Sequence, residues 1–305
     1  LRGPDTGAYA LEEEHNVTWV ETGLRGIDVS YWQVGADTRR DIDWAQVKGA
    51  GIQFVIIRIG DREWYDPMME RFVSGALRQG LLVNTYHYLR FNLLPHQQAE
   101  VIQRGLEKAR AEGLDRLARF WPDVEDSEPY GGDRVLWLEQ FLAAIGPGPN
   151  LGIYSGPGYW ASSMKKTTKF KDYHFWGAQY PFQDAQGRGK VPSLAELAQV
   201  QRYSVGGWGK DWSIWQYSSI GQVPGIPARV DLNVAKPGAV FAMPTITTPL
   251  NALVPPALND SNLIAGARPG LTWRQVLEED AWAFWGYAPD TARVQAMQEG
   301  RGCKG

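Results

Sequence analysis

The stretch that decides the fold is Phe54-Val55-Ile56-Ile57-Arg58-Ile59-Gly60, a nearly unbroken run of apolar and mostly β-branched residues. Such a run is typical of a strand that is buried on both faces in a parallel sheet. Helical spacing follows it, because apolar residues recur at intervals of three and four between Met68 and Leu77, and Gly80 supplies a stop. The sequence therefore predicts a strand followed by a helix.

The same alternation extends in both directions from this unit. The predicted strands cover residues 25–33, 54–60, 81–90, 120–125, 151–155, 174–180, 212–217 and 229–233. The first predicted helix begins at Asp43, and four more cover residues 68–77, 97–112, 134–145 and 157–164. No long helix separates the last two strands, so the domain is predicted to close with strands alone. About eight strands over roughly 220 residues favour a closed α/β barrel over an open sheet.

Composition excludes several classes of protein. The formal net charge of −3 and the pI of about 5.9 give no reason to expect nucleic acid or an anionic membrane surface as a partner. The single cysteine, Cys303, excludes an intramolecular disulfide and a multi-cysteine zinc site, and the four histidines have no ligand spacing. No metal or other cofactor is therefore expected. No apolar run approaches the ~20 residues that span a bilayer, and no signal peptide is visible at the start of the chain.

Changes in composition divide the chain into four predicted segments. Residues 1–23 form an N-terminal extension, residues 24–242 the barrel, residues 243–262 a linker rich in Pro and Thr, and residues 263–305 a small helical module. Some forty residues cannot bury a large core alone. The last segment is therefore expected either to pack on the main domain or to serve as a binding module.

The motif with the clearest chemistry is Phe120-Trp121-Pro122-Asp123-Val124-Glu125-Asp126. In an extended strand Asp123 and Glu125 share a face, roughly 6.6 Å apart. Like charges this close raise one pKa, which gives a proton donor beside an ionised partner, as the cleavage of a glycosidic bond requires. A triplet of this kind is also common on solvated strand edges and loops. Whether it is catalytic must therefore be judged from the surrounding sequence.

Two further aspartates join this motif if the barrel closes. Closure makes the first and last strands neighbours, with Asp28 near the end of the first and Asp231 within the last. Asp123 and Glu125 end the fourth strand. The four carboxylates are therefore predicted to converge at the C-terminal end of the strands, where barrel enzymes have their active sites. Each aspartate alone also fits a helix N-cap or a turn.

Four further side chains are candidates for substrate contact because they are predicted to lie at strand ends: Tyr86, Tyr154, Gln179 and Tyr217. Core or rim positions fit each of them as well. The 14 tryptophans and 13 tyrosines are compatible with a sugar-binding cleft, since flat rings stack on sugar rings, although large aromatic side chains also fill cores.

Six motifs in order and spacing resemble glycoside hydrolase family 25, the muramidases that include N,O-diacetylmuramidases and many phage endolysins. The likeness covers residues 24–242. Its motifs are Gly26-Ile27-Asp28-Val29-Ser30 with Trp32-Gln33, Tyr86-His87-Tyr88, Asp123-Val124-Glu125, Gly152-Ile153-Tyr154-Ser155, Trp215-Gln216-Tyr217 and Val230-Asp231-Leu232-Asn233. Arg58 departs from the pattern, in which a lysine is frequent at this place.

The resemblance implies a flattened (β/α)5(β)3 TIM-like barrel that hydrolyses the β-1,4 bond between N-acetylmuramic acid and N-acetylglucosamine. By motif, Glu125 is the general acid, Asp123 orients and stabilises the 2-acetamido group, and Asp28 and Asp231 support them. Attack by that acetamido group and attack by water both stay open. Bacterial peptidoglycan is the implied substrate, reached by secretion or phage delivery, and a monomer is expected. The last segment then becomes a candidate for cell-wall binding.

Two other interpretations stay open from the sequence. A non-catalytic peptidoglycan- or carbohydrate-binding barrel uses the same aromatic cleft but has no need of all four carboxylates. A chitinase-like or other glycosidase also needs a carboxylate pair, but Asp28 and Asp231 in their motifs fit the muramidase pattern better. The fold alone does not decide among these functions.

Overall fold

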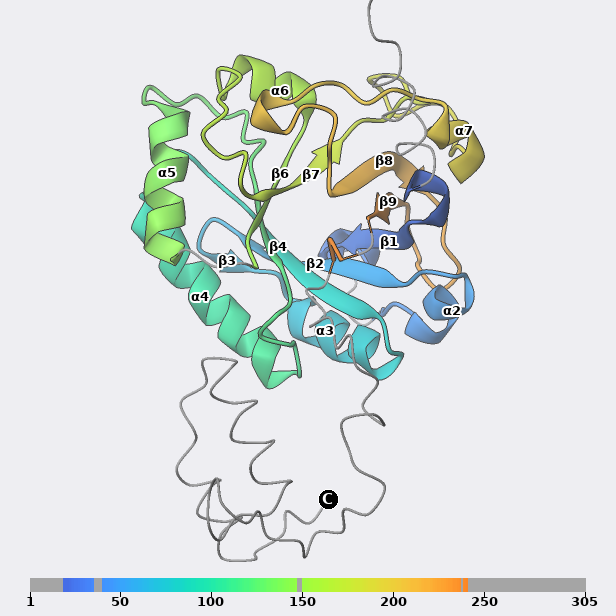
Figure 1. The fold of residues 1–305 in the computed structure, drawn as a ribbon. Helices are drawn as coiled ribbons and strands as arrows, with labels where there is room; N and C mark the ends of the chain where they lie inside the picture. Colours follow the sequence, from blue (N-terminus) through green and yellow to red (C-terminus); the bar gives the residue numbers. More distant parts are fainter. Residues whose placement is uncertain (1–18, 36–39, 147–149, 237, 241–305) are drawn as a thin grey trace, which may run out of the picture. The chain divides into compact units, whose positions relative to one another are not determined.

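Nine strands form one sheet, which closes into an eight-stranded barrel with a short extra strand at its rim (Figure 1). The computed structural model describes residues 19–35, 40–146, 150–236 and 238–240, all within the compact unit Leu1–Ala242. The predicted linker, the predicted C-terminal module and most of the N-terminal extension lie outside the described residues.

The strand order is β1-β9-β8-β7-β6-β5-β4-β2, and β1 also pairs with β2, which closes the barrel. Neighbouring barrel strands are parallel except where β9 pairs with β8 and β1, and the short β3 is antiparallel to β2. The predicted closed α/β barrel with an all-strand closure is thus confirmed. The strands are β1 Leu24–Val29, β2 Phe54–Asp61, β3 Trp64–Tyr65, β4 Leu82–Tyr88, β5 Phe120–Asp123, β6 Gly152–Ser155, β7 His174–Ala178, β8 Ile214–Gly221 and β9 Val230–Ala235.

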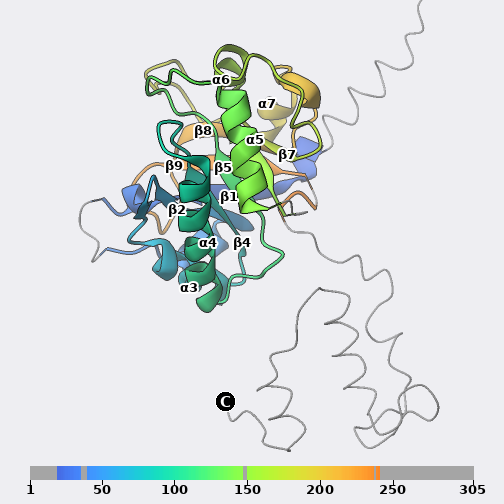
Figure 2. The same ribbon diagram turned by 90° about the vertical axis from the view of Figure 1, so that its left-hand side faces the viewer.

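The helices cover the outside of the barrel, and α4 lies beside α5 (Figure 2). Five of them match predicted helices. The short α7 and the 3-10 turns η1 and η2 were not predicted, although Ser193 and Glu196 form a capping box that signals the start of α7. The helices are α2 Trp44–Gly49, α3 Met69–Arg78, α4 Pro95–Ala111, α5 Arg134–Ile145, α6 Pro157–Ser162 and α7 Leu194–Ala198, with η1 Tyr31–Gln33 and η2 Gly206–Trp208.

Strand β2 is buried on both faces, as its sequence predicts. Phe54 and Ile56 belong to the apolar cluster inside the barrel, whereas Val55 and Ile57 belong to the larger cluster between sheet and helices. The inner cluster is tight, because a Cβ atom on Gly26 would lie 2.3 Å from the ring of Phe54. The barrel interior is therefore a packed core.

The hydrogen bonds between β5 and β6 are interrupted near the end of β5. Phe120 N–H donates to the carbonyl of Asn150, and Val124 N–H donates to that of Tyr154, each at 2.9 Å. Pro122 lies between these two donors and has no N–H to give, so the ladder to β6 is interrupted there. Asp123 is the last residue of the strand, and Glu125 follows beyond it.

Candidate active site

Barrel closure places Asp28 directly opposite Asp231 across the antiparallel pair of β1 and β9. Asp28 Oδ2 accepts hydrogen bonds from Gln216 Nε2 and Asn233 Nδ2, both at 2.8 Å. Burial raises the pKa of Asp28 to about 6, although these hydrogen bonds oppose the rise. Burial, followed by the charge of Asp28, raises the pKa of Asp231 well above its ordinary value. A hydrogen bond between the two carboxyl groups lowers the pKa of Asp28 and raises that of Asp231 further.

Asp123 is buried at the end of β5, and no described group donates a hydrogen bond to its Oδ1 atom. Burial raises the pKa of Asp123 well above its ordinary value, and the negative charges of Glu125 and Asp28 raise it further. The structure thus gives this carboxylate an unused acceptor oxygen within an acidic cluster.

Glu125 is half-buried just beyond β5. Burial raises its pKa to about 7, the charge of Asp28 adds to the rise, and a hydrogen bond with Tyr154 opposes it. A pKa near neutrality makes both the protonated and the ionised form of Glu125 available at neutral pH. A carboxyl group in this state, beside an ionised Asp28, has the properties of a general acid.

The structure brings together the four carboxylates that the sequence selected. Each of Asp28, Asp123, Glu125 and Asp231 has a pKa raised by burial, and the charge of Asp28 acts on the other three. Their separate catalytic roles stay predictions.

Arg90 fixes the segment that follows Glu125. Its guanidinium donates to both oxygens of Asp61, at 2.8 and 2.7 Å, and to Asp126 Oδ1 at 3.1 Å. Asp126 is fully buried, and its other oxygen accepts the N–H of Phe91 at 3.1 Å. The residue next to Glu125 is thus held against the ends of β2 and β4.

Replacing Arg90 by Ala is expected to lower the free energy of unfolding by about 3 kcal/mol, because Asp126 then remains buried without its cation. It is also expected to reduce the hydrolytic rate about tenfold through displacement of Glu125. Denaturant unfolding and initial rates check both effects. Arg188→Ala, which breaks an exposed ion pair with Asp184, is the matched control and should change stability by less than about 1 kcal/mol. Equal losses in the two variants would contradict the role assigned to Arg90.

A polar network that the sequence analysis missed supports Asp28. Gln216 Oε1 accepts the hydroxyl groups of Tyr154 at 2.9 Å and Tyr180 at 2.5 Å, while Asn233 Oδ1 accepts the indole N–H of Trp176 at 2.8 Å. Gln216 and Asn233 both belong to motifs quoted above. A polar side chain between apolar neighbours on a barrel strand faces the interior, and this alternation was the available signal.

Of the candidates for substrate contact, Tyr86 and Tyr154 lie with the carboxylates. Both rings pack against Trp176, with centroids 6.1 and 4.5 Å away, and the charges of Asp28 and Asp123 act on both hydroxyl groups. Gln179 instead holds a loop, because its Nε2 donates to the carbonyl of Gln201 at 3.1 Å and its Oε1 accepts the N–H of Tyr203 at 2.8 Å.

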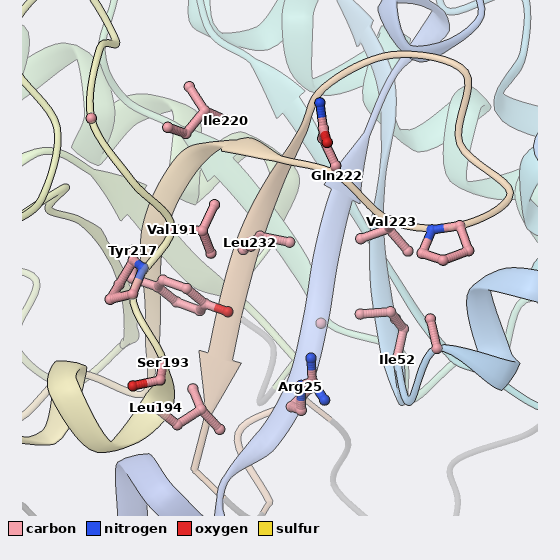
Figure 3. Close-up of a pocket in the computed structure, with 15 residues that line it drawn as sticks. Arg25, Ile52, Val191, Ser193, Leu194, Tyr217, Ile220, Gln222, Val223 and Leu232 are labelled. Carbon is pink, nitrogen blue, oxygen red and sulfur yellow. The ribbon is translucent and has the colours of Figure 1, made fainter.

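The prediction for Tyr217 needs a correction. It lies within β8 rather than at a strand end, and it belongs to the apolar cluster between the sheet and the helices. Tyr217 lines a separate pocket of about 640 Å³ on the outer side of the sheet, together with Arg25 and Leu232 (Figure 3). It therefore points away from the carboxylates.

Among the residues that the structure describes, no group of three or more His, Cys, Asp or Glu residues is arranged to hold a metal ion. Among the same residues, every helix is too short or too polar to cross a membrane.

A closed α/β barrel with a carboxyl group of raised pKa among other carboxyl groups is the arrangement that barrel glycoside hydrolases use. The sequence profile of glycosyl hydrolases family 25 matches residues 27–226, and the chain belongs to this family.

Known relatives agree with this assignment. The chain is 26% identical to Lysozyme M1 of Streptomyces globisporus over 243 residues, which is 75% of this chain and 74% of the relative. It is 24% identical to the autolytic lysozyme of Clostridium acetobutylicum over 229 residues, which is 74% of this chain and 60% of the relative. Neither alternative interpretation finds support among these relatives.

Solved structures share the fold. The catalytic domain of an endolysin from a Listeria monocytogenes bacteriophage superposes with a TM-score of 0.56 at 21% identity, covering 72% of this chain and 95% of that one. A family GH25 lysozyme from Aspergillus fumigatus superposes with a TM-score of 0.52 at 20% identity, covering 75% and 96%. The predicted TIM-like barrel is confirmed by these likenesses.

Proposed function

We propose that this glycoside hydrolase is a muramidase, which cleaves the β-1,4 bond between N-acetylmuramic acid and N-acetylglucosamine in bacterial peptidoglycan. The observation that carries the proposal is the position of Glu125, just beyond β5 and within a cluster of carboxylates whose burial raises its pKa to about 7. The lysozyme names of its relatives support the choice of substrate.

Glu125 donates its proton to the glycosidic oxygen as the bond breaks. Asp123 offers its unused Oδ1 to the N–H of the 2-acetamido group. That hydrogen bond favours the ionised form of Asp123, and the resulting negative charge helps Glu125 to keep its proton until transfer. The same charge stabilises the positive charge that develops on the sugar ring. These roles are compatible with attack by the acetamido oxygen and with attack by water.

Asp28 and Asp231 tune the acid, since the charge of Asp28 contributes to the raised pKa of Glu125. Tyr86 and Tyr154 line the same end of the barrel and contact the substrate. The protein works outside the cell, as a secreted enzyme or as a phage enzyme delivered to the wall. It acts as a monomer, without nucleic acid as a partner.

The bond that is cleaved can be read from the new reducing ends. Digested cell wall is reduced with labelled borohydride, hydrolysed, and separated by mass spectrometry. The label is expected on muramic acid. Label on glucosamine would contradict the choice of bond, and the absence of new reducing ends would contradict glycosidase activity altogether.

The rate of hydrolysis is expected to fall as the pH rises through about 7, because the acid must be protonated to act and the pKa of Glu125 is about 7. Asp28→Asn removes a negative charge that raises this pKa, so the alkaline limb of the kcat/KM profile should move to lower pH. Profiles measured on soluble glycan strands check this. Asp172→Asn, at an exposed site, should leave the profile in place. An alkaline limb that is unchanged in Asp28→Asn would contradict the coupling.

A further inference from the structure

Three aromatic side chains, Tyr31, Trp32 and Trp64, form a cluster that we call the aromatic platform. The exposed fractions of Trp32 and Trp64 are 62% and 45%, which is unusual for such large apolar side chains. The ring of Tyr31 joins them, with its centroid 4.4 Å from that of Trp32 and 5.4 Å from that of Trp64. Neither the carboxylates nor the polar network accounts for this cluster.

A buried ion pair holds the platform in place. The guanidinium carbon of Arg58 lies 5.1 Å from the ring centroid of Tyr31 and 5.4 Å from that of Trp64. Arg58 Nε donates to Asp66 Oδ2 at 2.9 Å, and the same oxygen accepts the backbone N–H of Tyr31 at 3.0 Å. The rings are therefore positioned before any ligand arrives, which lowers the entropy cost of binding.

The platform lies at the same end of the barrel as the carboxylates. Trp32 belongs to η1, which begins directly after β1 and its Asp28, while Trp64 pairs with Asp61 at the end of β2. The register sets Asp61 level with Tyr88 of β4, and Tyr88 level with Asp123 of β5. Asp61 and Asp123 are thus separated by two strand spacings, or about 10 Å.

Arg58 links the platform to the site electrostatically. Burial and the neighbouring carboxylates raise the pKa of Asp123, and the positive charge of Arg58 opposes this rise. The guanidinium that supports the rings therefore also lies near Asp123. A ligand that reaches from Asp123 towards β2 meets the aromatic platform next.

The chemistry of the platform fits a sugar ring. Flat exposed indole rings offer an apolar surface, which matches the C–H faces of a pyranose. The charge of Arg58 is balanced by Asp66, so the platform presents no net charge to an ionic peptide or a phosphate. We propose that the aromatic platform is a subsite for a sugar ring of the peptidoglycan glycan strand, beyond the bond that is cleaved. The inference rests on the proposed muramidase function.

Steady-state hydrolysis of peptide-free glycan strands by the full chain tests the subsite. Trp64→Ala and Trp32→Ala are each expected to raise KM about tenfold with kcat changed less than about twofold, because the platform binds ground state and transition state alike. Trp64→Tyr, which keeps a flat ring, should recover most of the loss. Leu136→Ala, at an exposed apolar site on α5, is the matched control and should behave as the wild type.

Binding measured without turnover separates the subsite from the chemistry. In the Glu125→Gln background, Trp64→Ala should weaken the binding of peptide-free glycan strands about tenfold. Unchanged KM and unchanged binding in both alanine variants would overturn the subsite while leaving the muramidase assignment intact. A loss confined to peptide-bearing substrates would overturn the choice of a sugar ring. A wild-type chain that cleaves no glycan would instead overturn the proposed function.

Discussion

Glu125→Gln is expected to reduce the rate of peptidoglycan hydrolysis by about 10²- to 10⁴-fold, the contribution that a positioned general acid makes. Glutamine has nearly the same shape but cannot release a proton to the glycosidic oxygen. The release of soluble fragments from purified cell walls measures the loss. Unchanged lysis would remove Glu125 from the role of acid and leave Asp123 as the next candidate.

The pH dependence of the stability of Glu125→Gln shows whether this variant is correctly folded. The pKa of Glu125 is raised from 4.5 to about 7 in the folded protein, so the folded state keeps a proton that the unfolded chain releases between these values. The stability linked to this proton is complete below about pH 4.5 and is lost as the pH rises through about 7. Glutamine does not ionise. The difference in unfolding free energy between Glu125→Gln and the wild type should therefore depend on pH. It should be more favourable to the variant at pH 8 than at pH 4, by about 2 to 3 kcal/mol. A variant that is equally destabilised at both values would show that its lost activity reflects damage to the fold.

Asp123→Asn is expected to lower kcat by about 10²- to 10³-fold, which is the usual effect of removing one group that stabilises developing charge. Asparagine keeps an oxygen that accepts the acetamido N–H, so substrate binding is preserved and KM should change little. What it loses is the negative charge near the sugar ring. Initial rates on soluble glycan strands over a range of concentrations separate kcat from KM.

Asp172→Asn is the matched control for this variant, because that carboxylate is 82% exposed and belongs to no part of the site. Its kcat and KM should equal those of the wild type. A loss in Asp123→Asn that falls mainly on KM would contradict charge stabilisation and would instead assign Asp123 to ground-state binding. A loss smaller than about tenfold would move the charge-stabilising role to Asp28.

The barrel was largely predictable because its signals are local. The apolar run of β2 and the helical spacing of α3 each appear within about ten residues of sequence, and hydrophobic periodicity is a property of such windows. Strand β3 and helix α7 escaped prediction for a different reason. With two and five residues, they have little periodicity of their own, and β3 exists because it pairs with the end of β2.

The site residues were predictable where a short motif contains the reactive side chains. They were not predictable where their role depends on the direction in which a side chain points. Asp123 and Glu125 are adjacent enough in sequence to be recognised as a pair. Tyr217 was predicted to contact substrate because it was expected at a strand end, yet it lies within β8 and lines an outer pocket, whereas its neighbour Gln216 reaches Asp28. Arg90 was missed because its partners lie on separate segments, with no motif to connect them.

The sequence by itself determined which carboxylates the chain possesses, and its strand pattern determined that they end at one mouth of a barrel. Only the tertiary structure decided how their pKa values shift. The pKa of a carboxyl group depends on the water and the charges around it, and the residues next to it in the sequence specify neither. Asp28 and Asp231 come from the two ends of the barrel sequence, and closure alone buries them side by side and sets their charge against Glu125.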